Sequence, residues 1–342
     1  MRVTAVTCVK NEGPFLLEWI AFNRMIGVTD HLFYSNDCTD GTDLMLDALA
    51  RHGIVTHLPN PAEGRNYQME ALRDARQQAV VTNADWLWIA DVDEFLNIHA
   101  GNGTLPDLIR ACGEPSAISV TFQFFANAGI DGFVDKPVIE QFTRSHNPDI
   151  WTDQTAQEVK SLFRTDLLIK YIGAHRPFLR PKALKRPYPV WTDGSGRLVP
   201  EEFLLGEEKN RLRKFPARGA RSLATLNHYA LRSLDSYLVK NDRGDVNREH
   251  RHFDDSYWRE RNDDAHEDLT IRRHLPKLKK EIAALKKLDG IKAQHAACVK
   301  AHKAKIEELN ALPSFADMRA KLRAAPVTPP QEDAMIAMLT DG

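Results

Sequence analysis

At 342 residues, the chain is long enough for one large domain with an appendage, or for two domains. Its hydrophobic content of 43% and charged content of 27% are those of an ordinary globular protein, and a formal net charge of −1 argues against nucleic acid as a partner. No apolar run approaches the length that spans a bilayer, and the four cysteines are too scattered for a metal-ligand pair or a disulfide framework. The first residues enter a strand pattern without a signal peptide, so we expect a cytoplasmic location.

The first part of the chain alternates between strand and helix patterns. β-branched and apolar runs predict strands at residues 2–9, 31–35, 54–58 and 86–90. Apolar residues at helical spacing predict helices between them at residues 15–26, 44–51 and 67–81. This alternation is typical of a parallel sheet wound with crossover helices, which binds ligands beyond the carboxyl ends of its strands.

The most informative stretch runs from Trp86 to Leu96, where five apolar residues are followed almost at once by Asp91, Asp93 and Glu94. Side chains alternate along a strand, so Asp91 and Asp93 can point the same way. Two adjacent carboxylates repel each other and are costly to desolvate, and a hard divalent cation removes both costs. We therefore expect a metal–diphosphate site at the carboxyl end of a central strand. A solvated acidic turn is the alternative for this stretch alone.

No glycine-rich nucleotide-binding motif follows the first strand, and the alternation of strands and helices ends near residue 117. Neither a Rossmann G-x-G-x-x-G nor a Walker loop follows the first strand, so NAD-dependent and P-loop interpretations fall away. Strand patterns without long helices between them predict a mixed extension of the sheet at residues 117–125, 137–142 and 159–163. Residues 177–218 read as a long irregular loop, either an active-site lid or a surface excursion. Helical patterns dominate from residue 274 onward.

Four motifs occur in order along the chain. They are Cys8-Val9-Lys10-Asn11-Glu12 with Glu18-Trp19 after it, Ser35-Asn36-Asp37-Cys38-Thr39-Asp40-Gly41-Thr42, Trp88-Ile89-Ala90-Asp91-Val92-Asp93-Glu94-Phe95, and Asn227-His228-Tyr229 followed by Arg232-Ser233 and Lys240-Asn241-Asp242-Arg243-Gly244. On these motifs the sequence resembles the GT-A glycosyltransferases, and within them the family 2 and family 92-type branch with a D-x-D-E-F motif. The resemblance implies an α/β fold of the GT-A type, Rossmann-like, with a mostly parallel sheet wound with helices. It covers residues 1–270 as the glycosyltransferase domain and leaves residues 271–342 as a helical C-terminal extension.

The resemblance also implies a function and a set of site residues. The implied reaction moves a sugar, as a hexosyltransferase does, from a nucleotide-sugar donor to a glycan or lipid-linked acceptor, with a UDP-sugar as the first expectation. The residues that would bind the donor are Asn11, Glu12, Asp37, Gln68 and Asp91. The residues that would hold Mn²⁺ or Mg²⁺ are Asp91, Asp93 and His228. An imidazole ligand suits Mn²⁺ better than Mg²⁺.

Several of these residues also have a simpler interpretation. Taken alone, His228 reads as a satisfied core or surface histidine, and Gln68 as an exposed helix residue. An inverting enzyme needs a base for the acceptor hydroxyl, and Asp153 is our candidate because it follows the D-x-D strand in a polar segment. An ordinary loop aspartate is the alternative. We expect Glu94 to orient neighbouring backbone rather than to abstract a proton.

The sequence allows more than one role for several cationic residues. Lys160, Lys240 and Arg243 can be read as partners of phosphate charge or as surface cations. The run from Lys277 to Lys280 reads as a solvated helix face, as a surface that docks a partner, or as part of C-terminal helices that associate peripherally with the inner membrane.

Two other function classes compete with a glycosyltransferase. A haloacid-dehalogenase-like phosphatase also places D-x-D after a buried strand, but that strand comes near its N-terminus and is not followed by Glu-Phe. A non-catalytic module that binds a nucleotide-sugar or a carbohydrate would keep the fold without turnover.

Overall fold

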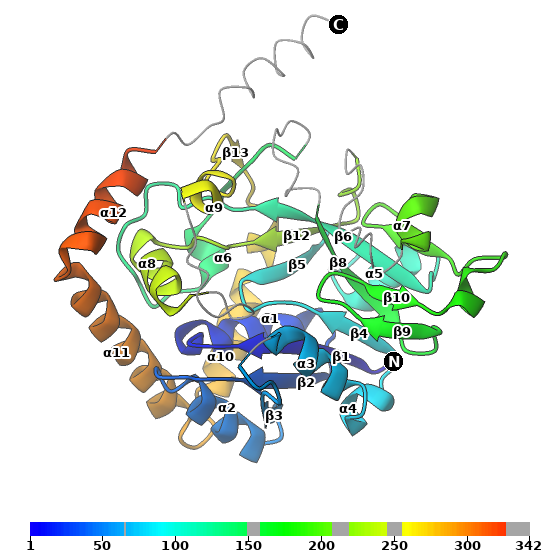
Figure 1. Ribbon diagram of the computed structural model, residues 1–342, viewed down its shortest axis with the longest axis horizontal. Helices are drawn as coiled ribbons and strands as arrows, with labels where there is room; N and C mark the ends of the chain where they lie inside the picture. Colours follow the sequence, from blue (N-terminus) through cyan, green and yellow to red (C-terminus); the bar gives the residue numbers. More distant parts are fainter. Residues whose placement is uncertain (65, 149–157, 207–218, 245–254, 326–342) are drawn as a thin grey trace, which may run out of the picture.

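The computed structural model describes residues 1–64, 66–148, 158–206, 219–244 and 255–325. Its centre is a nine-stranded sheet in the order β3-β2-β1-β4-β8-β6-β12-β5, with β11 paired to β6 (Figure 1). The strands of this sheet are β1 (Val3–Val9), β2 (Asp30–Ser35), β3 (Thr56–Pro59), β4 (Trp86–Ile89), β5 (Glu94–Ile98), β6 (Ala117–Phe124), β8 (Val159–Arg164), β11 (Trp191–Asp193) and β12 (Ala224–His228). Two small antiparallel pairs are β9 (Ile169–Ile172) with β10 (Pro177–Leu179), and β7 (Arg144–Ser145) with β13 (His266–Glu267).

Helices cover the sheet and form the C-terminal region. The α-helices are α1 (Leu16–Ile26), α2 (Thr42–Arg51), α3 (Tyr67–Ala75), α4 (Ala79–Thr82), α5 (Leu105–Ala111), α6 (Val138–Gln141), α7 (Glu201–Leu205), α8 (Leu234–Arg243), α9 (Asp255–Arg259), α10 (Leu275–Leu285), α11 (Ile291–Asn310) and α12 (Pro313–Arg323). The short 3₁₀ helices are η1 (Gly13–Phe15), η3 (Pro181–Leu184) and η4 (Thr270–His274).

The parallel half of the sheet follows directly from the sequence. Every residue of β1 is buried, because its neighbours β2 and β4 flank it and both of its faces are covered. One apolar cluster joins β1 to α1 on one face, and a second joins it to α3 on the other. Gly27 ends α1 with a φ of 110°, a left-handed conformation that glycine adopts without a steric cost.

Strand direction decides which residues meet at the edge of the sheet. β4 is antiparallel to β8, β8 is antiparallel to β6, and β6 is parallel to β12. β12 therefore runs in the same direction as β4, and the carboxyl ends of β1, β2, β4 and β12 lie at one edge. β8 begins at that same edge. Most neighbouring strands pair parallel, so the predicted α/β class with a mostly parallel sheet is confirmed.

The C-terminal helices pack against the body of the protein. Leu278 and Leu285 of α10 and Ile291 of α11 belong to the same apolar cluster as α1. A Cβ added to Gly13 would lie 2.6 Å from the side chain of Cys298, so a glycine there lets α11 approach η1 closely. Figure 1 shows α11 and α12 along one side of the molecule, next to α8. The predicted helical C-terminal region is confirmed, and a domain boundary near residue 270 stays a prediction.

Parts of the predicted secondary structure are wrong. The predicted strand at 137–142 is instead the short helix α6, whose first amides, from Val138 and Ile139, donate hydrogen bonds to Glu18 at 2.6 and 3.1 Å. The single helix predicted at 67–81 is two helices, α3 and α4. The predicted irregular loop contains β10, η3, β11 and α7, and its residues 207–218 lie outside the described part. A short apolar run does not by itself distinguish a strand from a buried helical turn.

Candidate functional site

Polar loops follow the carboxyl ends of β1 and β2. The Asn11 side chain donates to Thr39 Oγ1 at 3.0 Å and accepts the Thr39 amide at 2.7 Å, so it links the two loops. Asn11 and Asp37 have φ values of 53° and 46°, a left-handed conformation that Asn and Asp tolerate better than most residues. The Asp37 side chain is 59% exposed and lies 3.7 Å from the ammonium of Lys10. A polar, partly open surface lies beyond these strands.

Asp91 follows β4 and is held by residues of the sheet and of α3. The ammonium of Lys160, in β8, lies 2.9 Å from Asp91 Oδ2 and 3.3 Å from Glu94 Oε2. The Gln68 side chain donates to Asp91 Oδ1 at 3.4 Å. Glu94 accepts the backbone amide of Asp91 at 2.9 Å, which is the backbone-orienting contact that we expected of Glu94. Burial would lower the pKa of Lys160, but the charges of Asp91 and Glu94 outweigh burial and raise it.

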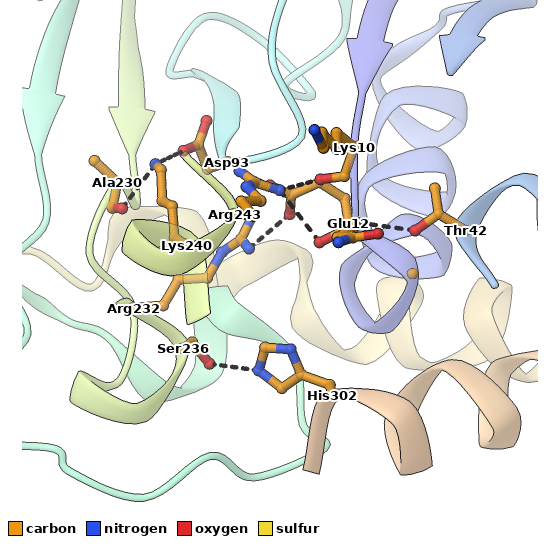
Figure 2. Close-up of polar contacts among 12 residues, drawn as sticks. Lys10, Glu12, Thr42, Asp93, Ala230, Arg232, Ser236, Lys240, Arg243 and His302 are labelled. Carbon is orange, nitrogen blue, oxygen red and sulfur yellow. Dashed lines mark hydrogen bonds and ion pairs between the residues drawn. The ribbon is translucent and has the colours of Figure 1, made fainter. Parts of the chain in front are cut away.

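Asp93 faces the later elements of the chain. Its Oδ2 accepts a hydrogen bond from Lys240 of α8 at 2.8 Å, and its Oδ1 lies 3.5 Å from Nε2 of His228, at the end of β12 (Figure 2 shows the Lys240 contact). Burial would raise the pKa of Asp93, but the charge of Lys240 and the hydrogen-bonding contact with His228 hold it well below its usual range. Asp93 is therefore an anion over the whole neutral range.

Asp93, Glu94 and His228 form a candidate cation site. Each offers a ligand atom, and these atoms lie within 4.8 Å of one another. Burial lowers the pKa of His228, so its imidazole is neutral near pH 7, and its Nδ1 is buried without a hydrogen-bond partner among the described residues. Burial, together with the charges of Asp91 and Asp93, raises the pKa of Glu94 despite the nearby Lys160. Two carboxyl groups and a neutral imidazole form a donor set that fits Mn²⁺.

Glu12 lies beside this group in a buried cluster of charges. Arg232 donates to Glu12 Oε2 at 2.8 Å and Arg243 lies 2.7 Å from Oε1, so both carboxylate oxygens are paired (Figure 2). Arg243 also donates to the carbonyl of Lys10, and the Arg232 guanidinium lies over the ring of Phe15. Burial would raise the pKa of Glu12, but the two guanidinium groups lower it. Glu12 thus ties the loop after β1 to the segment that carries α8.

The structure brings most of the predicted site residues to one edge of the sheet. Those residues are Asn11, Glu12, Asp37, Gln68, Asp91, Asp93 and His228. The predicted roles of Asp91 as a cation ligand and of Asp153 as the base stay predictions. Asp91 lies outside the candidate cation group, in which Glu94 takes its place, and Asp153 lies outside the described residues. The sequence places Arg232 in the fourth motif but does not show its role, because its partner Glu12 lies 220 positions away in the chain.

Comparison with known protein families assigns the chain to a class of proteins. The family model of glycosyltransferase family 92 matches residues 4–193. The chain belongs to glycosyltransferase family 92.

Curated relatives and solved structures extend the comparison. A glycosyltransferase family 92 protein of Oryza sativa subsp. japonica is 32% identical over 108 residues, which cover 30% of this chain and 17% of that protein. A family 92 protein of Ricinus communis is 31% identical over 99 residues, covering 28% and 17%. The match thus spans about a sixth of the length of these relatives. The crystal structure of S. aureus TarS 1-349 matches 94% of this chain and 88% of its own at 11% identity, with a TM-score of 0.35.

Proposed function

We propose that this protein is a metal-dependent glycosyltransferase that moves a sugar from a nucleotide-sugar donor, with a UDP-sugar as the first candidate, to a glycan or lipid-linked acceptor. The observation that carries the proposal is the meeting of Asp93, Glu94 and His228 at the edge of the sheet where the loops after β1, β2 and β4 lie. Family membership supports the sugar transfer. It also removes the phosphatase alternative.

The proposed chemistry centres on the leaving nucleoside diphosphate. Mn²⁺, or Mg²⁺ in its place, would be held by Asp93, Glu94 and His228, and would supply Lewis-acid stabilisation of the negative charge on the departing phosphates. Asp91, whose side chain is 39% exposed, would orient the donor from the open side of the turn. Lys160 would keep Asp91 and Glu94 in place, and preorganised charge of this kind is usually the largest catalytic contribution.

The loops after β1 and β2 would bind the nucleoside. Asn11 fixes the second loop through Thr39, and the exposed carboxylate of Asp37 is available to hydroxyl groups of a ribose. Asp153 remains our candidate for the base that takes the proton of the acceptor hydroxyl.

Association with the inner membrane remains part of the proposal. No helix in the described part of the chain is both long and apolar enough to cross a bilayer. A cytoplasmic protein that acts on a lipid-linked acceptor would have to reach the membrane surface, and we propose that the C-terminal helices make this contact. Vesicle flotation of the full chain and of its Lys277→Glu, Lys280→Glu variant would test it, because both lysines are exposed and neither belongs to the core.

Release of nucleoside diphosphate from a panel of UDP-, GDP- and dTDP-sugars, with and without Mn²⁺, tests the proposed activity. We expect slow, Mn²⁺-dependent hydrolysis of one donor that is lost in Asp93→Ala and reduced in Asp91→Ala. Asp166→Ala is a matched control, because Asp166 is exposed, pairs with Arg164 and follows the opposite end of β8. Donor binding without turnover, with or without acceptor glycans, would instead favour a binding module. Failure to bind any nucleotide-sugar would contradict the proposal.

A further inference from the structure

The segment from Arg232 to Arg243 carries three cationic side chains toward two acidic groups of the site. Arg232 and Arg243 pair with Glu12, and Lys240 pairs with Asp93 (Figure 2). The two arginines are fixed on one buried carboxylate. Lys240, in contrast, occupies an oxygen of the residue that would ligate the cation.

The helix that carries Lys240 is anchored at both ends. Ser233 caps α8 by accepting the Ser236 amide, and Ser236 is hydrogen-bonded at 3.1 Å to His302 of α11. At the other end, Arg243 is tied to Glu12. The backbone of α8 is therefore held in place, and the part of Lys240 that can be repositioned is its flexible four-carbon side chain.

Lys160 provides the contrast within the same site. Its side chain is 2% exposed, and it bridges Asp91 and Glu94 from the interior of the sheet. The Lys240 side chain is 14% exposed, and its ammonium also donates to the carbonyl of Ala230 at 2.9 Å. An ammonium 2.8 Å from Asp93 would repel a divalent cation bound to the same carboxylate. Both cannot keep their best geometry on Asp93 at once.

We propose that Lys240 is a resident counter-ion of Asp93, which it gives up to the divalent cation, and that its ammonium then pairs with the diphosphate of the donor. This inference rests on the proposed function of the site. Before the donor arrives, Lys240 neutralises a buried carboxylate that would otherwise lack a full counter-charge. With the donor bound, the same ammonium offsets phosphate charge. Cation binding and nucleotide binding are thereby coupled, and each strengthens the other.

Calorimetric titration of Mn²⁺, in the absence of nucleotide, tests the competition for Asp93. In Lys240→Met we expect Mn²⁺ to bind about tenfold more tightly than in the wild type, because a competing charge is gone. Lys240→Arg keeps the charge and should stay near the wild-type affinity. Lys305→Met is the matched control, since Lys305 pairs with Asp242 and Glu308 and makes no contact with Asp93 in the described structure.

A second titration, of UDP at saturating Mn²⁺, tests the transfer to the diphosphate. We expect Lys240→Met to bind UDP roughly tenfold more weakly, and Lys305→Met to bind it as the wild type does. Lys240→Gln, which keeps most of the side-chain length and a hydrogen-bond donor, should repeat both changes and covers the case in which Lys240→Met does not fold.

The outcomes separate this inference from the proposed function. Unchanged or weaker Mn²⁺ binding in the neutral variants would overturn the competition, and unchanged UDP binding would overturn the transfer, in each case while the wild type still binds both ligands. A wild-type protein that binds neither Mn²⁺ nor UDP would instead contradict the proposed function itself.

Discussion

Asp91 and Asp93 are two residues apart in one turn, yet they lie in different surroundings. The Asp91 side chain is 39% exposed and its partners, Lys160 and Gln68, come from β8 and the start of α3. The Asp93 side chain is 10% exposed and its partners, Lys240 and His228, come from α8 and the end of β12. Asp91 thus contacts the sheet and the open surface, whereas Asp93 contacts residues that lie more than a hundred positions later in the chain.

This difference indicates that the two carboxylates of the D-x-D turn have different roles. A buried carboxylate beside a neutral imidazole and a second carboxyl group has the surroundings of a cation ligand. A half-exposed carboxylate held by a fixed lysine is better suited to orient a ligand from outside. We therefore expect changes at the Asp93 end to be more damaging than changes at the Asp91 end.

The largest expected effect is the loss of activity in Asp93→Asn. With a suitable donor and Mn²⁺, we expect the rate of nucleoside diphosphate release to fall by about 10³-fold, because a buried charge that positions the cation is removed. For Asp91→Asn we expect a smaller fall, roughly 10- to 100-fold, because the cation group is left intact. Steady-state kinetics of the two variants would measure both losses. Equal losses, or a larger loss in Asp91→Asn, would contradict the different roles that we assign to the two carboxylates.

A second large effect concerns Glu12, which holds the segment that serves Asp93. Glu12→Gln leaves the guanidinium groups of Arg232 and Arg243 without a counter-charge, and should lower the free energy of unfolding by about 3–5 kcal/mol. Urea denaturation measures this loss. Glu140→Gln is the control, because Glu140 pairs with a half-exposed Lys279 and should cost less than about 1 kcal/mol. Similar losses of unfolding free energy in the two variants would contradict the proposal that the buried pairs of Glu12 hold α8 in place.

The pH dependence of stability distinguishes Glu18 of α1 from Asp93, because their pKa values shift in opposite directions. Burial raises the pKa of Glu18 to about 7, although the amides of Val138 and Ile139 oppose the shift. This group therefore stabilises the fold fully below its unfolded value near 4.5, and loses about 3 kcal/mol as pH rises through 7. Asp93, with its lowered pKa, acts in the opposite sense and loses its stabilisation only as the solution becomes strongly acidic.

Unfolding curves between pH 4.5 and 8 would measure this dependence. Glu18→Gln should flatten the fall in stability over that range, whereas Asp93→Asn should not. A fall that persists unchanged in Glu18→Gln would assign the titration to another group.

The smallest expected effect lies at the open end of the turn. Gln68 reaches Asp91 through a hydrogen bond of 3.4 Å at a partly exposed position, which is worth little. Gln68→Ala should raise the KM for the donor about threefold and leave kcat unchanged. A loss as large as that of Asp91→Asn would mean that Gln68 contributes as much as the carboxylate to orienting the donor.

The sequence was sufficient for the parallel half of the fold and for part of the site. Strands such as Val3–Val9 consist of apolar and β-branched residues, and the carboxylates of the turn after Ile89 stand next to one another in the sequence. The short run at Val138–Gln141 was misread as a strand, because its helical turn depends on the distant acceptor Glu18. Likewise, nothing local links Lys240 to Asp93, since their contact spans 147 positions and depends on the packing of α8.

Calorimetry of Mn²⁺ binding without nucleotide, on the wild type, Asp93→Asn and Asp91→Asn, shows which of the two carboxylates ligates the cation. We expect Asp93→Asn to lose Mn²⁺ binding and Asp91→Asn to stay within about tenfold of the wild type, because Asp91 lies outside the cation group. Loss of binding in Asp91→Asn, with Asp93→Asn unaffected, would contradict this expectation.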